Sequence, residues 1–239
     1  MITFRRSGGM PPGSDEWLQI DADGRFRMRR VDAVGAIGSF AGALDEETHR
    51  RVMAEADECA GAPGPGEPGP GGAPGPGGAP GPGGPPPAVV PDSVTERVDV
   101  DAHSESLGSY DEPTGACAPL VTDLRALLDA LIEHPVAALA LEVAPPRAVL
   151  RHRGRTALRL EAEPIEVTTV HWDVDGSVLA QEQARVPVAA QDVAPGWELT
   201  VVDDLPAPTP GQWLQVDLIL AVTVDGARHA GVLHHMQEA

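Results

Sequence analysis

Residues 61–88 read GAPGPGEPGPGGAPGPGGAPGPGGPPPA, and this stretch decides how the rest of the chain is divided into folding units. It has no large apolar side chain that could fill a hydrophobic core. Glycine recurs at every third position from Gly66 to Gly84, which is the period of a collagen triple helix. Several triplets are Gly-Pro-Gly, and the second glycine raises the entropic cost of ordering them. The composition therefore favours a disordered, partly polyproline II segment over residues 61–92.

The composition of the whole chain limits its function. The 239 residues carry a formal net charge of -19, which argues against binding to nucleic acid or to an anionic membrane surface. All 17 basic residues are arginine, and lysine and asparagine are absent, which indicates a GC-rich coding sequence. No apolar run is long enough to span a bilayer, and the first residues lack the pattern of a signal peptide. We therefore expect a cytoplasmic protein, monomeric or weakly oligomeric.

Alternating side chains predict a β-hairpin near the N-terminus, after a first short strand that begins at Ile2. A three-residue loop with Gly24 in the left-handed conformation would connect the two strands of this hairpin. It would bring apolar residues together on one face, Ile20 with Phe26 and Leu18 with Met28. On the other face Trp17 would lie opposite Arg29, where a cation–π contact can form. The row of arginines on that face could bind an anion or simply be solvated.

A helix is predicted on each side of the Gly/Pro-rich segment. Asp45 suits an N-cap position, and the helix that follows it is expected over residues 46–58. Leucines at helical spacing predict the other helix over residues 119–133, before Pro135.

Between the segment and the second helix, residues 94–102 alternate as a strand with one buried face, and residues 103–114 resemble a polar loop. One strand and one helix cannot close a core by themselves. Residues 1–143 are therefore expected to form one α+β domain, an antiparallel sheet with two helices, interrupted by the disordered excursion over residues 61–92.

Residues 147–239 show no helical signal and are expected to form an all-β, immunoglobulin-like sandwich. Gly, Pro and Asp separate short alternating runs of residues. The predicted strands cover residues 148–153, 157–162, 166–172, 177–187, 197–202, 213–224 and 228–235. The boundary between the two domains is placed at Ala144-Pro145-Pro146.

Two stretches resemble known families. ITFRRSGG at residues 2–9, followed by LQIDADGRFRM at residues 18–28, resembles small bacterial domains that begin with an Arg-Ser-Gly-Gly strand, among them the emfourin-type inhibitors of thermolysin-like metallopeptidases. Met10-Pro11-Pro12-Gly13 replaces the Gly-Phe-Ala-Gly continuation of that pattern, so no inhibitory residue is carried over. PTPGQWLQVDLILAVTVDG at residues 208–226 resembles the late strands of a fibronectin type III or immunoglobulin-like sandwich, with Trp213 where such domains often have tyrosine.

Histidine and cysteine offer few candidates for chemistry. His229, His234 and His235 are close in sequence, but neighbours on a strand point to opposite faces, so a metal would need a ligand from elsewhere. Cys59 and Cys117 match no zinc motif, and two buried or idle thiols are expected. Cys117 could also form a nucleophile pair with a distant histidine, although no activating motif surrounds it.

Other polar residues are explained without catalysis. Ser39 lies one place too early in Gly-Ser-Phe-Ala-Gly for a nucleophile elbow. Asp203 and Asp204 adjoin each other on a loop, whereas acid/base pairs face each other across a cleft. The Gly-rich segment alternates with proline, which lacks the N–H donors that hold a phosphate. The sequence therefore predicts no catalytic, cofactor-binding or metal-ligating set and no cofactor.

One cluster of charge suggests an interaction. The basic residues around His152 could be neutralised by cross-strand carboxylates, or they could form a surface for an acidic partner; they are Arg147, Arg151, Arg153, Arg155 and Arg159. We therefore expect a non-enzymatic protein that acts through contacts with an unknown protein partner, not with nucleic acid or membrane. The alternatives are a metallopeptidase inhibitor acting through the N-terminal domain, and an enzyme with no recognisable motif.

Overall fold

The computed structural model describes residues 1–8, 14–61, 94–108, 112–113 and 115–239. Apart from Gly61, the predicted excursion over residues 61–92 lies outside these ranges. The described residues are mainly β-strands, arranged in two sheets, and they also form two α-helices. None of these helices is long and apolar enough to cross a membrane.

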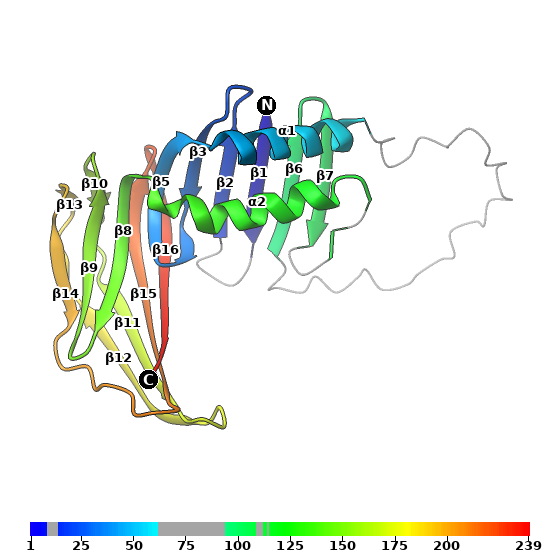
Figure 1. Cartoon of the computed structure of the whole chain (residues 1–239). Helices are drawn as coiled ribbons and strands as arrows, with labels where there is room; N and C mark the ends of the chain where they lie inside the picture. Colours follow the sequence, from blue (N-terminus) through cyan, green and yellow to red (C-terminus); the bar gives the residue numbers. More distant parts are fainter. Residues whose placement is uncertain (9–13, 62–93, 109–111, 114) are drawn as a thin grey trace, which may run out of the picture.

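The larger sheet has nine strands in the order β14-β9-β8-β5-β3-β2-β1-β6-β7 (Figure 1). Its strands are β1 (Ile2–Gly8), β2 (Ser14–Ile20), β3 (Arg25–Arg30), β5 (Ala36–Ala43), β6 (Val94–Val100), β7 (His103–Gly108), β8 (Pro135–Ala144), β9 (Arg147–Gly154) and β14 (Glu198–Val202). β1 pairs with β6 in an antiparallel manner, so the chain before and after residues 62–93 contributes neighbouring strands.

The predicted hairpin of β2 and β3 is confirmed, including its register. Ile20 lies opposite Phe26 and Leu18 lies opposite Met28, all four of them buried. Gly24 has a φ of 78°, the left-handed conformation that the three-residue loop requires. On the other face, the guanidinium carbon of Arg29 lies 5.9 Å from the centre of the Trp17 ring, which confirms the expected cation–π contact.

Both predicted helices are present. They cover one face of the large sheet over the strands β5-β3-β2-β1-β6-β7, as Figure 1 shows. They are α1 (Glu46–Ala60) and α2 (Ala118–Ala130), the latter continued by a 3-10 turn, η1 (Leu131–Glu133). The Asp45 carboxylate accepts a hydrogen bond from the backbone N–H of Thr48 and so caps α1 as predicted. Leucines of α2 and the apolar residues of β1, β2 and β3 form the core beneath the helices.

The second sheet has seven strands. They are β4 (Asp32–Val34), β10 (Leu158–Leu160), β11 (Ile165–Trp172), β12 (Val178–Val186), β13 (Gln191–Val193), β15 (Trp213–Val224) and β16 (Ala227–Glu238). Their main order is β12-β11-β15-β10-β13, and β16 pairs with both β15 and β4. This sheet packs through a second hydrophobic core on the end of the large sheet formed by β8, β9 and β14.

The two cores lie on opposite faces of β5 and β8. Ala138 and Ala140 of β8 pack in the core under the helices, whereas Leu139 and Leu141 pack against the second sheet. The predicted boundary at residues 144–146 coincides with the turn between β8 and β9, and these two strands pair with each other in one sheet. The second sheet therefore packs on β5 and β8, which precede that boundary. The expected α+β description of residues 1–143 applies only in part.

Three strands of the large sheet differ from the expectation for their residues. The sequence predicts no element for β5 or β8, because neither alternates like a strand with one buried face. β5 reads AIGSFAGA, with two glycines and a serine, and β8 reads PVAALALEVA, which is almost continuously apolar. Residues 103–108 are expected in a loop, yet they form the edge strand β7. The turn that leads into β7 contains Asp101 with a φ of 50° and no glycine, so the usual hairpin signal is missing.

Candidate functional site

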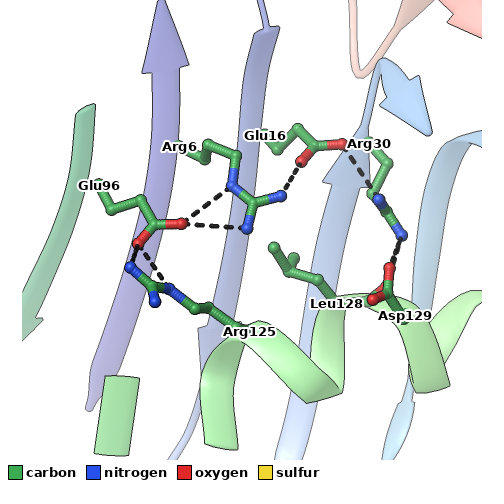
Figure 2. A network of polar contacts seen from close by, with 7 residues as sticks. All are labelled: Arg6, Glu16, Arg30, Glu96, Arg125, Leu128 and Asp129. Atoms are coloured by element: carbon green, nitrogen blue, oxygen red, sulfur yellow. Dashed lines mark hydrogen bonds and ion pairs between the residues drawn. The ribbon is translucent and has the colours of Figure 1, made fainter. Parts of the chain in front are cut away.

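A row of alternating charges crosses the large sheet beneath α2 (Figure 2). Glu96 of β6 accepts hydrogen bonds from Arg6 of β1 at 3.0 and 3.1 Å and from Arg125 of α2 at 2.6 and 2.8 Å. The Glu96 side chain is 0% exposed, so its negative charge depends on these two arginines.

The same row continues from Arg6 towards β3. Arg6 also reaches the buried Glu16 at 3.4 Å, and Arg30 donates a hydrogen bond to Glu16 at 3.0 Å. Arg30 is itself held by the backbone oxygen of Leu128 and by the Asp129 carboxylate at the end of α2. Among the described residues the row contains three arginines and three carboxylates, and its bonds from Arg125, Leu128 and Asp129 attach α2 to the sheet.

The position of Arg6 bears on the N-terminal resemblance. Arg6 is the first residue of Arg-Ser-Gly-Gly, and its guanidinium lies between Glu16 and Glu96 under α2. Gly9, the last residue of that motif, lies outside the described residues. The arginine of the motif thus has a structural role here, in the ion pairs beneath α2.

The two cysteines form a disulfide bond, so the expectation of idle thiols was wrong in this respect. Both are buried as expected, with Cys59 0% and Cys117 2% exposed. The bond connects the last turn of α1 to the residue that precedes α2. His103 of β7 lies beside it, with its Nε2 atom 3.5 Å from the Cys117 sulfur. The structure thus places a histidine next to Cys117, from a strand that was expected to be a loop.

The three C-terminal histidines do not converge on one point. His234 lies opposite Asp217 on the neighbouring strand β15, and its Nδ1 atom is 2.9 Å from the Asp217 carboxylate. His235 lies opposite Val216 and His229 opposite Val222, which are inward-facing positions of β15. The alternation along β16 therefore separates His234 from the other two, as the sequence predicted.

His152 is the buried histidine of the second core. It lies opposite Leu139 and is 3% exposed, and neither ring nitrogen has a hydrogen-bond partner among the described residues. Burial lowers the pKa of His152 below its usual value, because the low-polarity surroundings disfavour the imidazolium.

This environment predicts a loss of stability in mild acid. Above about pH 6.5 the histidine is neutral in both the folded and unfolded states, and its contribution to stability is fully present. As the pH falls through that value towards the lowered pKa, only the unfolded state gains the proton, and the free energy of unfolding should fall by at most about 1.4 kcal/mol per pH unit. Urea denaturation at a series of pH values measures this.

His152→Leu is the variant that should flatten this part of the pH profile. His171→Ala, which changes a half-buried histidine of β11, serves as the control and should leave the slope as it is. A slope that persists in His152→Leu would show that another group causes it.

The other residues considered from sequence are dispersed. Ser39 lies within β5, opposite Arg29, and not on a strand-to-helix turn. Asp203 and Asp204 are exposed in the segment after β14. Three arginines of the basic cluster are engaged by carboxylates: Arg151 by Glu142 and Glu198, Arg153 by Glu142, and Arg159 by Glu161 and Asp192. Cross-strand neutralisation is therefore the better interpretation for these three.

A different arginine surface emerges from the order of the strands. We call it the arginine face: the side of β1, β2, β3 and β6 turned away from the helices, with Arg5, Trp17, Arg25, Arg27, Arg29 and Arg97. Arg5 lies directly opposite Arg97 on one side and opposite Trp17 on the other. Like charges opposite each other on neighbouring strands destabilise a sheet, and here Asp99, which bonds to Arg97 and attracts Arg5, offsets part of that cost.

The arginine face is hollowed at its border with the second sheet. One hollow of about 420 Å³ is lined by Trp17 and Arg27 and by Asp225 from the turn between β15 and β16. An adjacent one of about 390 Å³ is lined by three arginines, Arg25, Arg27 and Arg155, and by one acidic residue, Asp21. Arg97 and Arg25 pair with Asp99 and Asp23, whereas no described carboxylate forms an ion pair with Arg5, Arg27 or Arg155. These guanidinium groups are available to an anionic ligand.

Comparisons with known proteins give no relative for this chain. No family model, no curated protein and no solved structure matches it.

Proposed function

We propose that the protein is a non-enzymatic binding protein and that the arginine face binds an acidic segment of a partner protein. The observation that supports this is the direct opposition of Arg5 and Arg97 in a chain whose net charge is -19. Asp99 pairs with Arg97 and also attracts Arg5, so it offsets part of their repulsion, and a further carboxylate from the partner at Arg5 would relieve the rest. Guanidinium groups stay protonated at any physiological pH, so they suit recognition better than proton transfer.

The chemistry of the face favours carboxylates as ligands. Arginine binds a carboxylate through two parallel N–H donors. The exposed Arg27 provides such donors at both hollows, Arg155 at the border of the face provides them at the second, and Arg5 lies outside the hollows on the same face. Trp17 adds an apolar ring between them, on which a side chain of the partner can pack. A nucleic acid would extend beyond this face over an acidic surface, and its association would be opposed by the net charge of the protein.

We further propose an immunoglobulin-like arrangement for the sandwich. The stacking of β11, β15 and β16 on β8 and β9 supports it, as does the long alternating strand β15. In this arrangement the second sheet also forms one wall of the hollow at Asp225 and so helps to delimit the binding surface.

A charge-matched pair of variants tests the binding proposal. The triple variant Arg5→Gln, Arg27→Gln and Arg155→Gln removes three charges from the proposed surface. The control, Arg147→Gln, Arg185→Gln and Arg228→Gln, removes the same number of exposed charges elsewhere. A short glutamate-rich peptide should bind the wild type, and the face variant should bind it about tenfold more weakly at low salt. The control should match the wild type.

Fluorescence anisotropy of the labelled peptide measures these affinities, and a single-stranded DNA of equal formal charge is the competitor. Equal losses in both variants would mean that only net charge matters, and they would contradict the proposal. Tighter binding of the DNA than of the peptide would also contradict it and would identify the face as a nucleic-acid surface.

A further inference from the structure

Four side chains with metal-binding groups meet at the β7 edge of the large sheet. They are Cys59 at the end of α1, Cys117 before α2, and His103 and Glu105 on β7. One potential ligand atom from each lies within 4.8 Å of those of the other three. His103 and Glu105 are two positions apart on one strand, so they point to the same face, towards the helices.

We propose that this cluster binds a zinc ion when the disulfide between Cys59 and Cys117 is reduced. Two thiolates, an imidazole nitrogen and a carboxylate oxygen are the ligand types that zinc takes in proteins, and four of them complete a tetrahedral site. Calcium and magnesium prefer ligand sets made of oxygen, so the two sulfur atoms select against them. Because the protein would supply all four ligands and leave none to water or substrate, the zinc ion would have a structural role.

The fold supplies what such a site needs. The N-terminus of α2 begins at Cys117, so the positive end of the helix dipole lies beside the negative charge of the proposed site. His103 already lies 3.5 Å from the Cys117 sulfur. The two cysteines are almost fully buried, whereas His103 and Glu105 are half-buried, which gives a metal ion a route in from the sheet edge.

The change from disulfide to metal site balances in electrons and protons. A dithiol reductant donates two electrons and two protons, so that the bond between the sulfur atoms breaks, two thiols form and the reductant becomes a disulfide. Zinc then displaces the two thiol protons. The divalent ion with two thiolates and one carboxylate leaves a net charge of -1 at the site.

The two states would hold the helices in different ways. In the oxidised protein the disulfide ties α1 to α2. In the reduced protein the zinc ion would tie the same two helices together and would also attach them to β7 through His103 and Glu105. A reducing compartment, in which cysteines are kept as thiols at equilibrium, would therefore favour the metal-bound form.

Metal titration of the full chain in both redox states tests this proposal. One sample is reduced with a phosphine, a reductant that has no sulfur to bind zinc, and a second sample is kept oxidised. Both samples are titrated with cobalt(II), which serves as a spectroscopic probe, and then with zinc. The reduced chain should bind one ion, with a thiolate-to-cobalt charge-transfer band that zinc abolishes. The oxidised chain should show no such band.

Variants of β7 locate the site without touching the cysteines. His103→Ala and Glu105→Gln should each weaken zinc binding by roughly tenfold or more, whereas His171→Ala, a histidine change on β11, should not. Circular dichroism confirms that each variant is folded, and the partial exposure of both β7 residues makes folding failure a small risk. Binding of the ion by the oxidised chain, a missing charge-transfer band in the reduced chain, or full affinity in His103→Ala would each overturn the proposal.

Discussion

Replacing Glu96 with leucine should lower the free energy of unfolding by about 3–5 kcal/mol, because it leaves Arg6 and Arg125 without the carboxylate they share. Arg6 would retain Glu16, but the interaction between α2 and β6 would be lost. For a chain of this size the melting temperature should fall by about 10 °C. Urea denaturation and thermal circular dichroism measure the two quantities.

Glu198→Leu is the control for this prediction. Glu198 pairs with Arg151 at 2.9 Å, but both side chains are substantially exposed, so the loss should stay below about 1 kcal/mol. An equal loss in the two variants would show that burial of Glu96 does not matter. A negligible effect of Glu96→Leu would mean that the apolar contacts of α2 and its bonds to Arg30 hold the helix without Glu96.

Gly38→Ala should have the other large effect and should cost at least about 4 kcal/mol or prevent folding. Gly38 has a φ of 140°, and a Cβ atom there would lie 2.1 Å from the backbone oxygen of Ala137 and 2.6 Å from the Cα atom of Ala138. Both obstacles are backbone atoms of β8, so they can move only if β5 separates from β8. The yield of soluble protein and its circular dichroism spectrum report the outcome.

Gly226→Ala is the control that separates the effect of the steric clash from the effect of a positive φ. Gly226 also has a positive φ, 78°, but among the described residues no atom beyond its two chain neighbours lies within 4 Å of the position that a Cβ atom would take. Alanine there should therefore cost only about 1 kcal/mol. Similar losses in Gly38→Ala and Gly226→Ala would contradict the steric explanation.

The predictable part of the fold consists of elements with one buried face. The β2–β3 hairpin, both helices and most of the strands after residue 147 alternate or repeat in a way that marks their inner side, and the structure contains them close to the expected bounds. β5 and β8 could not be found in this way, since both of their faces are buried. The sequence also lacked a glycine signal for the turn before β7.

The candidate sites depend on strand order, which the sequence does not display. The arginines of β3 were visible as a row, but only the order β3-β2-β1-β6 adds Arg5 and Arg97 to the same surface. Cys59 and Cys117 are 58 positions apart, and no local spacing relates them to each other or to His103. The one available sign of the cluster was that His103 and Glu105 are two positions apart. This spacing places both side chains on one face only if the segment is a strand, and β7 was not predicted.

Because β5 and β8 are buried on both faces, the chain cannot be cut after β8 without exposing apolar side chains. A fragment that ends at Ala144 would lose β9 and most of the second sheet, and it would expose Ile37, Leu139 and Leu141 to water. Each such side chain contributes about 1.5–3 kcal/mol when buried, so the fragment would lose a large part of the stability of the whole. The two halves of the chain should therefore unfold together in one cooperative transition, and neither should be a stable protein when expressed alone.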